Sequence, residues 1–149
     1  MNPFRQRGFT LIELLIVITV SVMLLTVVAG SYTNFFFASV INGEVDSLVS
    51  ILRLAKSKSM AEVDDLSYQV VVTSDSFRLE TAGGGNQIEV HRLNTQSVVT
   101  SGSVTIVFDK ITGTTSSCTP TCTITIGNNP ATTQSKSVVV SDQGIITVL

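Results

Sequence analysis

The sequence is short of the residues from which most enzyme and metal sites are built. Its 149 residues include one histidine, two cysteines and no tryptophan, and only 13% of them are charged. A lone histidine excludes a histidine-rich metal set, and two cysteines are too few for a scaffold built on disulfides. Nine basic residues against eleven acidic ones give no general basic character of the kind that favours nucleic-acid binding. The length fits one modest domain.

Nothing in the sequence predicts catalysis. No serine or cysteine has an evident base and orienting acid, and Asp64 and Asp65 are adjacent, so their side chains diverge. The triplet Gly83-Gly84-Gly85 lacks the spacing and the Lys-Ser/Thr of a phosphate loop. We therefore expect no catalytic residue, no metal and no cofactor. We expect His91 to be solvated on the outer face of a strand.

One long apolar run follows a short basic segment. From Phe9 to Gly30 every residue except Glu13 is apolar or small. As a helix the run is about 33 Å long, enough to cross a bilayer core of about 30 Å. Its fifteen Leu, Ile, Val, Met and Phe residues contribute roughly −4.5 to −9 kcal/mol to insertion, against about +3 for one acid. Because Arg5 and Arg7 precede the run, we expect one membrane span with a cytoplasmic N-terminus and an exported remainder.

Three interpretations of this run are open. A secretory signal peptide cut after Ala29 is one, although the run exceeds the usual apolar core of about 7–15 residues. A plain membrane anchor explains everything except Glu13, because a carboxylate buried without a partner is costly. The third interpretation supplies a partner for that carboxylate.

The residues around Glu13 resemble a known processing signal. Gly8-Phe9-Thr10-Leu11-Ile12-Glu13 is similar to the class III signal of type IV pilins and type II secretion pseudopilins: a basic leader, a glycine, an aromatic residue, and a glutamate five positions after the glycine. The resemblance implies that a prepilin peptidase cuts between Gly8 and Phe9 and that Phe9 is then N-methylated. It also implies that the apolar helix stays attached and becomes the packing core of a filament.

Physical chemistry gives this interpretation a mechanism. Cleavage creates a positive amine on Phe9 close to the membrane, and Glu13 of one subunit could pair with that amine on a neighbour. Two buried charges that are each expensive alone become tolerable together, so the pair fixes register more than it adds stability. The alternative is a Glu13 that snorkels to the interface without a role.

The chain divides into four predicted parts. These are a leader over residues 1–8, a membrane and assembly helix over 9–30, an exported continuation of the helix over 31–62, and a β domain over 63–149. Between Gly30 and Gly43 the glycines and β-branched residues predict a weak helix that is liable to bend or unwind. The run Phe35-Phe36-Phe37 has two interpretations, a contact with membrane or other subunits, and burial under the globular domain.

The segment from Glu44 to Glu62 has the pattern of an amphipathic helix. Its apolar residues follow a spacing of about 3.6, and polar residues lie opposite. The predicted inner face comprises Val45, Leu48, Ile51, Leu52 and Ala55, and the predicted outer face comprises Asp46, Ser50, Arg53 and Ser57. Arg53, Lys56 and Lys58 lie near the helix end, where the helix dipole favours cations. That structural interpretation is favoured over a ligand site.

After Asp65 the pattern changes to a period of two. Strands are predicted around Tyr68–Val72, Phe77–Leu79, Ile88–Val90, Val104–Phe108, Thr123–Ile126, Ser137–Val140 and Ile145–Val148. Short strands with polar turns and no helical pattern between them indicate an antiparallel sheet. The predicted fold class is α+β, with a long N-terminal helix packed on a small antiparallel β domain.

Cys118 and Cys122 stand in an exported segment, where oxidation is permitted. A disulfide between them would close a five-residue loop and contribute about 2 kcal/mol in the chain-entropy model. Two free thiols are the alternative. A metal site with only these two soft ligands is not expected.

A finer resemblance lies in the segment Leu48–Ser59, which is similar to the helix end of the H-type pseudopilin and FimT group. Taken together, these resemblances imply a structural subunit, a minor pilin or H-type pseudopilin, of a type IV pilus-like or type II secretion filament. Its implied partners are other pilin or pseudopilin subunits, the prepilin peptidase and an assembly platform in the inner membrane.

Two other functions are the alternatives. One is a DNA-binding or adhesive module at a filament tip, and the other is a membrane-anchored exported domain with no filament role. Removal of the leader takes Arg5 and Arg7 and leaves seven basic residues against eleven acidic ones, which disfavours nucleic acid as a partner.

Overall fold

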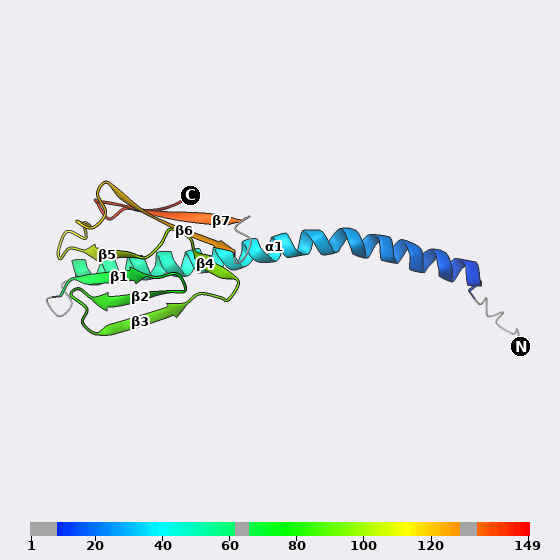
Figure 1. Cartoon of the computed structure of the whole chain (residues 1–149), viewed down its shortest axis with the longest axis horizontal. Coiled ribbons are helices and arrows are strands. Elements are labelled where there is room, and N and C mark those ends of the chain that lie inside the picture. Colours follow the sequence, from blue (N-terminus) through cyan, green and yellow to red (C-terminus); the bar gives the residue numbers. More distant parts are fainter. Residues whose placement is uncertain (1–8, 62–65, 129–133) are drawn as a thin grey trace, which may run out of the picture. The chain divides into compact units, whose positions relative to one another are not determined.

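The computed structural model describes residues 9–61, 66–128 and 134–149, without side-chain detail for residues 27–31. It contains one helix, α1 (Leu11–Met60), and eight strands (Figure 1). The chain divides into two compact units that meet between Phe36 and Phe37 in the sequence. Arg5, Arg7, Gly8, Asp64 and Asp65 lie outside the described residues.

The second unit contains two four-stranded antiparallel sheets. The first has the order β3-β2-β1-β5 and the second has the order β4-β6-β7-β8. The strands are β1 (Tyr68–Val72), β2 (Ser76–Thr81), β3 (Gln87–Arg92), β4 (Ser97–Val99), β5 (Val104–Phe108), β6 (Thr121–Asn128), β7 (Ser135–Ser141) and β8 (Ile146–Val148). The α+β prediction with a small antiparallel β domain is confirmed, and the division into two sheets with the short strand β4 is an addition to it.

The helix within this unit buries the face that its apolar spacing predicts. Val45, Leu48, Ile51, Leu52 and Ala55 are all buried and belong to one hydrophobic cluster. On the other side Asp46, Ser50, Arg53 and Ser57 are exposed. The predicted two-faced helix is therefore confirmed.

Both sheets contribute to the same core. The cluster takes in inward-facing side chains such as Val70 and Phe77 from the first sheet and Ile124 and Val138 from the second. Their burial alternates along each strand, as a sheet with one covered face requires. Burying the whole side chain of a residue of this size contributes about 1.5–3 kcal/mol. The domain therefore covers its own apolar surface.

The segment from Gly30 to Gly43 is helical throughout. The prediction that these glycines make a weak helix, liable to unwind, is wrong in this respect. An isolated glycine costs about 1 kcal/mol relative to alanine, which a helix with long apolar flanks tolerates. Tyr32 and Phe36, one turn apart, stack with ring centroids at 6.5 Å.

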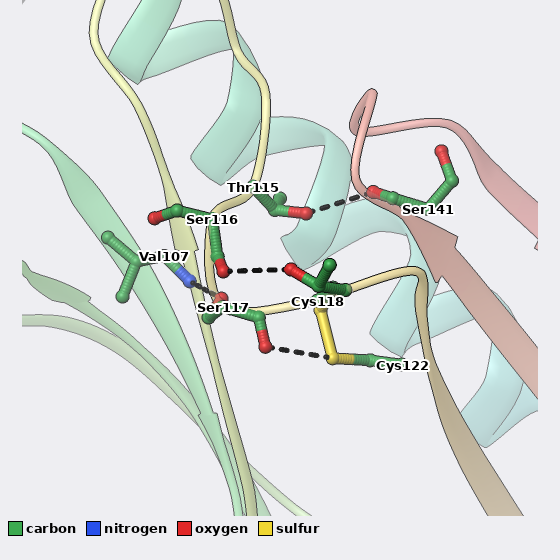
Figure 2. Close-up of a disulfide and its surroundings, with 8 residues drawn as sticks. Val107, Thr115, Ser116, Ser117, Cys118, Cys122 and Ser141 are labelled. Carbon is green, nitrogen blue, oxygen red and sulfur yellow. Dashed lines mark hydrogen bonds between the residues drawn. A yellow bond between two sulfur atoms is a disulfide. The ribbon is translucent and has the colours of Figure 1, made fainter.

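The disulfide lies in the connection between the two sheets. Cys118 and Cys122 are bonded, and their loop follows β5 and leads into β6 (Figure 2). The backbone N–H of Val107 in β5 donates to Ser117 Oγ at 3.0 Å, just before the first cysteine. The hydroxyl of Thr115 donates to the carbonyl of Ser141 at 2.9 Å, at the end of β7. This short segment thus joins an edge of one sheet to the last turn of the other.

Candidate functional site

The start of α1 brings together the residues of the predicted processing signal that the structure describes. Thr10 precedes the first helical residue, and Glu13 lies in the first turn. The backbone N–H of Glu13 donates to Thr10 Oγ1 at 3.3 Å, and Glu13 Oε2 accepts from the Thr10 backbone N–H at 3.4 Å. The Thr10 hydroxyl also donates to Glu13 Oε2 at 3.3 Å. This reciprocal arrangement is a capping box, in which a Thr and a Glu three residues later satisfy the free N–H groups of a helix start.

The sequence carries the signal for this cap as Thr-x-x-Glu before an apolar run, and our sequence interpretation assigned Thr10 no role. The cap places the Glu13 carboxylate at the positive end of the helix dipole. Glu13 therefore has partners within its own chain. These bonds lie within one helical turn and leave the choice between an anchor and an assembly helix open.

Phe9 lies directly before the cap and is exposed. Its neighbour in the sequence, Gly8, lies outside the described residues, so the structure says nothing of the expected cleavage bond. A new amine on Phe9 would lie one residue from the cap. The acid and the future terminus are thus neighbours along the chain, which is the arrangement that charge pairing between subunits would use.

The helix that follows the cap presents apolar side chains without cover. The large apolar side chains between Phe9 and Leu25 are each at least 50% exposed. A continuous apolar surface of this extent is not found on soluble monomers and marks contact with lipid or with other protein. Phe35 and Phe36 are also exposed, at 74% and 41%, so the burial interpretation is wrong for these two residues. Phe37 is half-buried.

Two stretches of α1 are apolar enough to consider as membrane segments. Tyr32–Met60 is long enough to cross a membrane, with a mean hydropathy of 1.4, but 39% of its most apolar window is buried within the protein. That stretch includes the core helix of the domain. Leu11–Thr26 is a shorter apolar helix whose side chains have no such cover. It is the part of the described chain whose apolar side chains are free to contact a membrane.

Two of the three cations near the end of α1 make contacts within the domain. Lys56 Nζ donates to the carbonyl of Gly144 at 2.9 Å, and Lys58 Nζ lies 5.7 Å from the centre of the Tyr68 ring. Gly144 has a positive φ of 67°, and a Cβ there would collide with the carbonyl oxygen of Gly113. Two of the three cations therefore hold the fold, and Arg53 alone is exposed.

His91 does not occupy the solvated outer position that its alternation with Ile88 and Val90 predicts. Its Nε2 lies 2.8 Å from Glu44 Oε2 on α1, and its ring stacks on Phe77 with centroids 4.6 Å apart. The other Glu44 oxygen accepts from the backbone N–H of Asn94 at 2.9 Å. The prediction is wrong because β3 is an edge strand, whose pattern shows two faces without showing which one meets the helix. The contact ties β3 to the helix within the domain.

No group of three or more His, Cys, Asp or Glu side chains in residues 9–61, 66–128 and 134–149 could hold a metal ion. Of the predicted site residues, Phe9 and Glu13 lie at the helix start, and Cys118 and Cys122 lie in the connection between the sheets.

Comparison with known proteins bears on the helix and on the domain separately. Residues 3–29 match the family model of the prokaryotic N-terminal methylation motif. No curated protein sequence matches the chain. Among solved structures, the chain is similar to the type IV minor pilin FimU of Pseudomonas aeruginosa strain PAO1. The match has 16% identity and a TM-score of 0.56, and it covers 72% of this chain and 91% of that one.

At this identity the likeness to the minor pilin shows the fold, and the motif at residues 3–29 supplies the sequence signature. A methylation motif that covers the start of an apolar helix is consistent with membrane anchoring. A methylation motif at residues 3–29 and the fold of a minor pilin together support a type IV pilin-like protein.

Proposed function

We propose that this chain is a structural subunit, a minor pilin or pseudopilin of the H-type and FimT kind, of a type IV pilus-like or type II secretion filament. It inserts in the inner membrane with a cytoplasmic N-terminus and an exported domain. A prepilin peptidase cuts between Gly8 and Phe9 and methylates Phe9. An assembly platform in the inner membrane then transfers the subunit to the filament. The observation that carries the proposal is the uncovered apolar helix behind a capped Glu13.

When the subunit moves from lipid into a filament, the helix exchanges one apolar environment for another. Apolar side chains lose little in the exchange, because neighbouring helices are as apolar as lipid tails. A charge at the helix start behaves differently, since it is costly in either apolar medium until it is paired. The Glu13 carboxylate then pairs with the Phe9 amine of a neighbouring subunit, and this fixes the axial register of the two helices.

The capping box lets the two roles of Glu13 be separated. Glutamine at this position retains the carbonyl acceptor that the cap uses but carries no charge. Glu13→Gln and Glu13→Ala are therefore both expected to insert in the membrane and to be lost from filaments. Thr10→Val, which removes the capping hydroxyl and keeps the carboxylate, is expected to remain in filaments. The measurement is the share of full-length chain in the sheared filament fraction of cells that carry the assembly machinery.

Normal incorporation of Glu13→Gln together with loss of Glu13→Ala would assign Glu13 to capping and contradict the charge pair. Absence of the unaltered chain from the filament fraction would contradict the filament role itself.

The structure does not favour the tip-located DNA-binding alternative. Lys56 and Lys58 are both engaged within the domain, and phosphate binding depends on clustered, available cations.

A further inference from the structure

The outer face of β2 and β3 contains a groove. The groove has a volume of about 630 Å³ and is lined by Asp75, Ser76, Arg78, Gln87, Val90 and Arg92. In the pairing of the two strands Arg78 stands opposite Val90, and Ser76 stands opposite Arg92. The two arginines are therefore diagonal neighbours on one face of the sheet, within reach of a common ligand.

Arg78 forms an ion pair with a residue two positions along its own strand. Its Nε lies 3.6 Å from Oε1 of Glu80, whose side chain is only 10% exposed. The second Glu80 oxygen accepts from Gln69 Nε2 at 3.3 Å, so the carboxylate itself is fixed. Within the part of the chain that the structure describes, the terminal nitrogens of Arg78 have no hydrogen-bond partner, and neither has the Arg92 side chain. A guanidinium presents its donors in a planar fork, which suits an oxyanion such as a carboxylate.

Apolar side chains lie beside this fork. Ile88 and Val90 on β3 are 44% and 47% exposed. Arginine together with exposed apolar side chains is the composition of protein contact surfaces rather than of a general surface. A ligand for this face therefore has both an anionic and an aliphatic part.

We propose that the groove docks a neighbouring pilin-like subunit through a segment that presents a carboxylate beside an aliphatic side chain. The carboxylate binds between Arg78 and Arg92, and the aliphatic side chain packs on Ile88 and Val90. The inference rests on the proposed function, since a filament supplies the neighbour. Charge complementarity favours a protein carboxylate over nucleic acid. Two guanidiniums with Asp75 in the same groove make a short site, whereas a phosphate backbone binds along a run of cations.

The test is photo-crosslinking of the full-length chain in cells that carry the assembly machinery, with p-benzoylphenylalanine in place of Val90. A second variant carries the same probe at Ile88, so that a folding defect at one position does not decide the result. We expect an adduct with a processed pilin-like subunit, recognised by mass spectrometry from its N-methylated aromatic N-terminus. The crosslinked peptide is expected to contain Asp or Glu.

Substitutions in the probe-bearing chain supply the controls. Arg92→Gln and Arg78→Gln are each expected to abolish the adduct. Lys136→Gln is a matched loss of one exposed positive charge on the other sheet and is expected to leave the adduct unchanged. An adduct that persists in Arg92→Gln, an adduct with nucleic acid or lipid, or no adduct at all from a filament-incorporated chain would overturn the docking proposal.

In the same cells the share of chain in filaments is measured separately. A chain that is incorporated but gives no adduct contradicts the docking surface and leaves the filament role intact. A chain that is not incorporated contradicts both.

Discussion

The two units of this chain use similar apolar residues to opposite effect. In the globular domain the large side chains of α1 that face the sheets are buried, and Leu48 and Leu52 are fully covered. In the N-terminal unit Leu14 and Leu15, on the same helix, are each 56% exposed. The domain supplies cover from its own strands, whereas the N-terminal unit has none within the described chain. Exposing an apolar surface of this extent to water is unfavourable. Lipid, and then the helices of a filament core, would cover it.

The largest expected difference between the two units is in the effect of a truncated leucine. Leu52→Ala removes a fully buried side chain and is expected to lower the free energy of unfolding of the domain by about 2–5 kcal/mol. Leu15→Ala truncates an exposed side chain and is expected to change it by less than about 0.5 kcal/mol. Urea unfolding of the full chain in detergent micelles, followed by near-ultraviolet circular dichroism, measures both. Equal losses would show that the two units are not energetically distinct.

A second difference concerns covalent reinforcement, which only the domain has. Replacing the disulfide by Cys118→Ala with Cys122→Ser is expected to cost about 2 kcal/mol, because the unfolded chain regains the entropy of a five-residue loop. The urea midpoint in the same micelles should fall accordingly. Thr121→Ala, an exposed residue in the same loop, is the control and should leave the midpoint unchanged. An unchanged midpoint in the double variant would contradict a stabilising role of the disulfide.

A third effect separates a buried acid from an exposed one on the same helix. Glu44 accepts hydrogen bonds from the Asn94 backbone and faces His91, so Glu44→Ala leaves a donor without a partner. The expected cost is about 1–3 kcal/mol. Asp46, two residues later and exposed, provides the control, since Asp46→Ala should stay within about 0.5 kcal/mol of the unaltered chain. If the two substitutions cost the same, the Glu44 contacts do not hold β3 to the helix.

The two regions also differ in what the sequence could predict. Local patterns were enough for the apolar helix, for the buried face that includes Val45 and Leu48, and for most of the strands. These features repeat with a fixed spacing that the residues show directly. The three-residue strand β4 was missed, and its pairing with β6 is a long-range contact that local spacing does not show.

Contacts between distant segments were beyond the reach of such patterns. Period two indicates that His91 and Val90 face opposite ways, but only the fold shows that His91 meets Glu44, 47 residues earlier. The bond from Lys56 to Gly144 likewise spans 88 residues. The Thr10 cap is different, because its signal, Thr-x-x-Glu before an apolar run, is local and lies in the sequence itself.

The central claim is that the mature protein begins at Phe9 and keeps the uncovered apolar helix. Mass spectrometry of the N-terminal peptide, from chain isolated out of cells that contain the processing peptidase, measures this directly. The account predicts a peptide that begins with N-methylated Phe9 and runs on into the apolar helix. A mature chain that begins at Met1, or one that begins at Gly30 after removal of the helix, would contradict it.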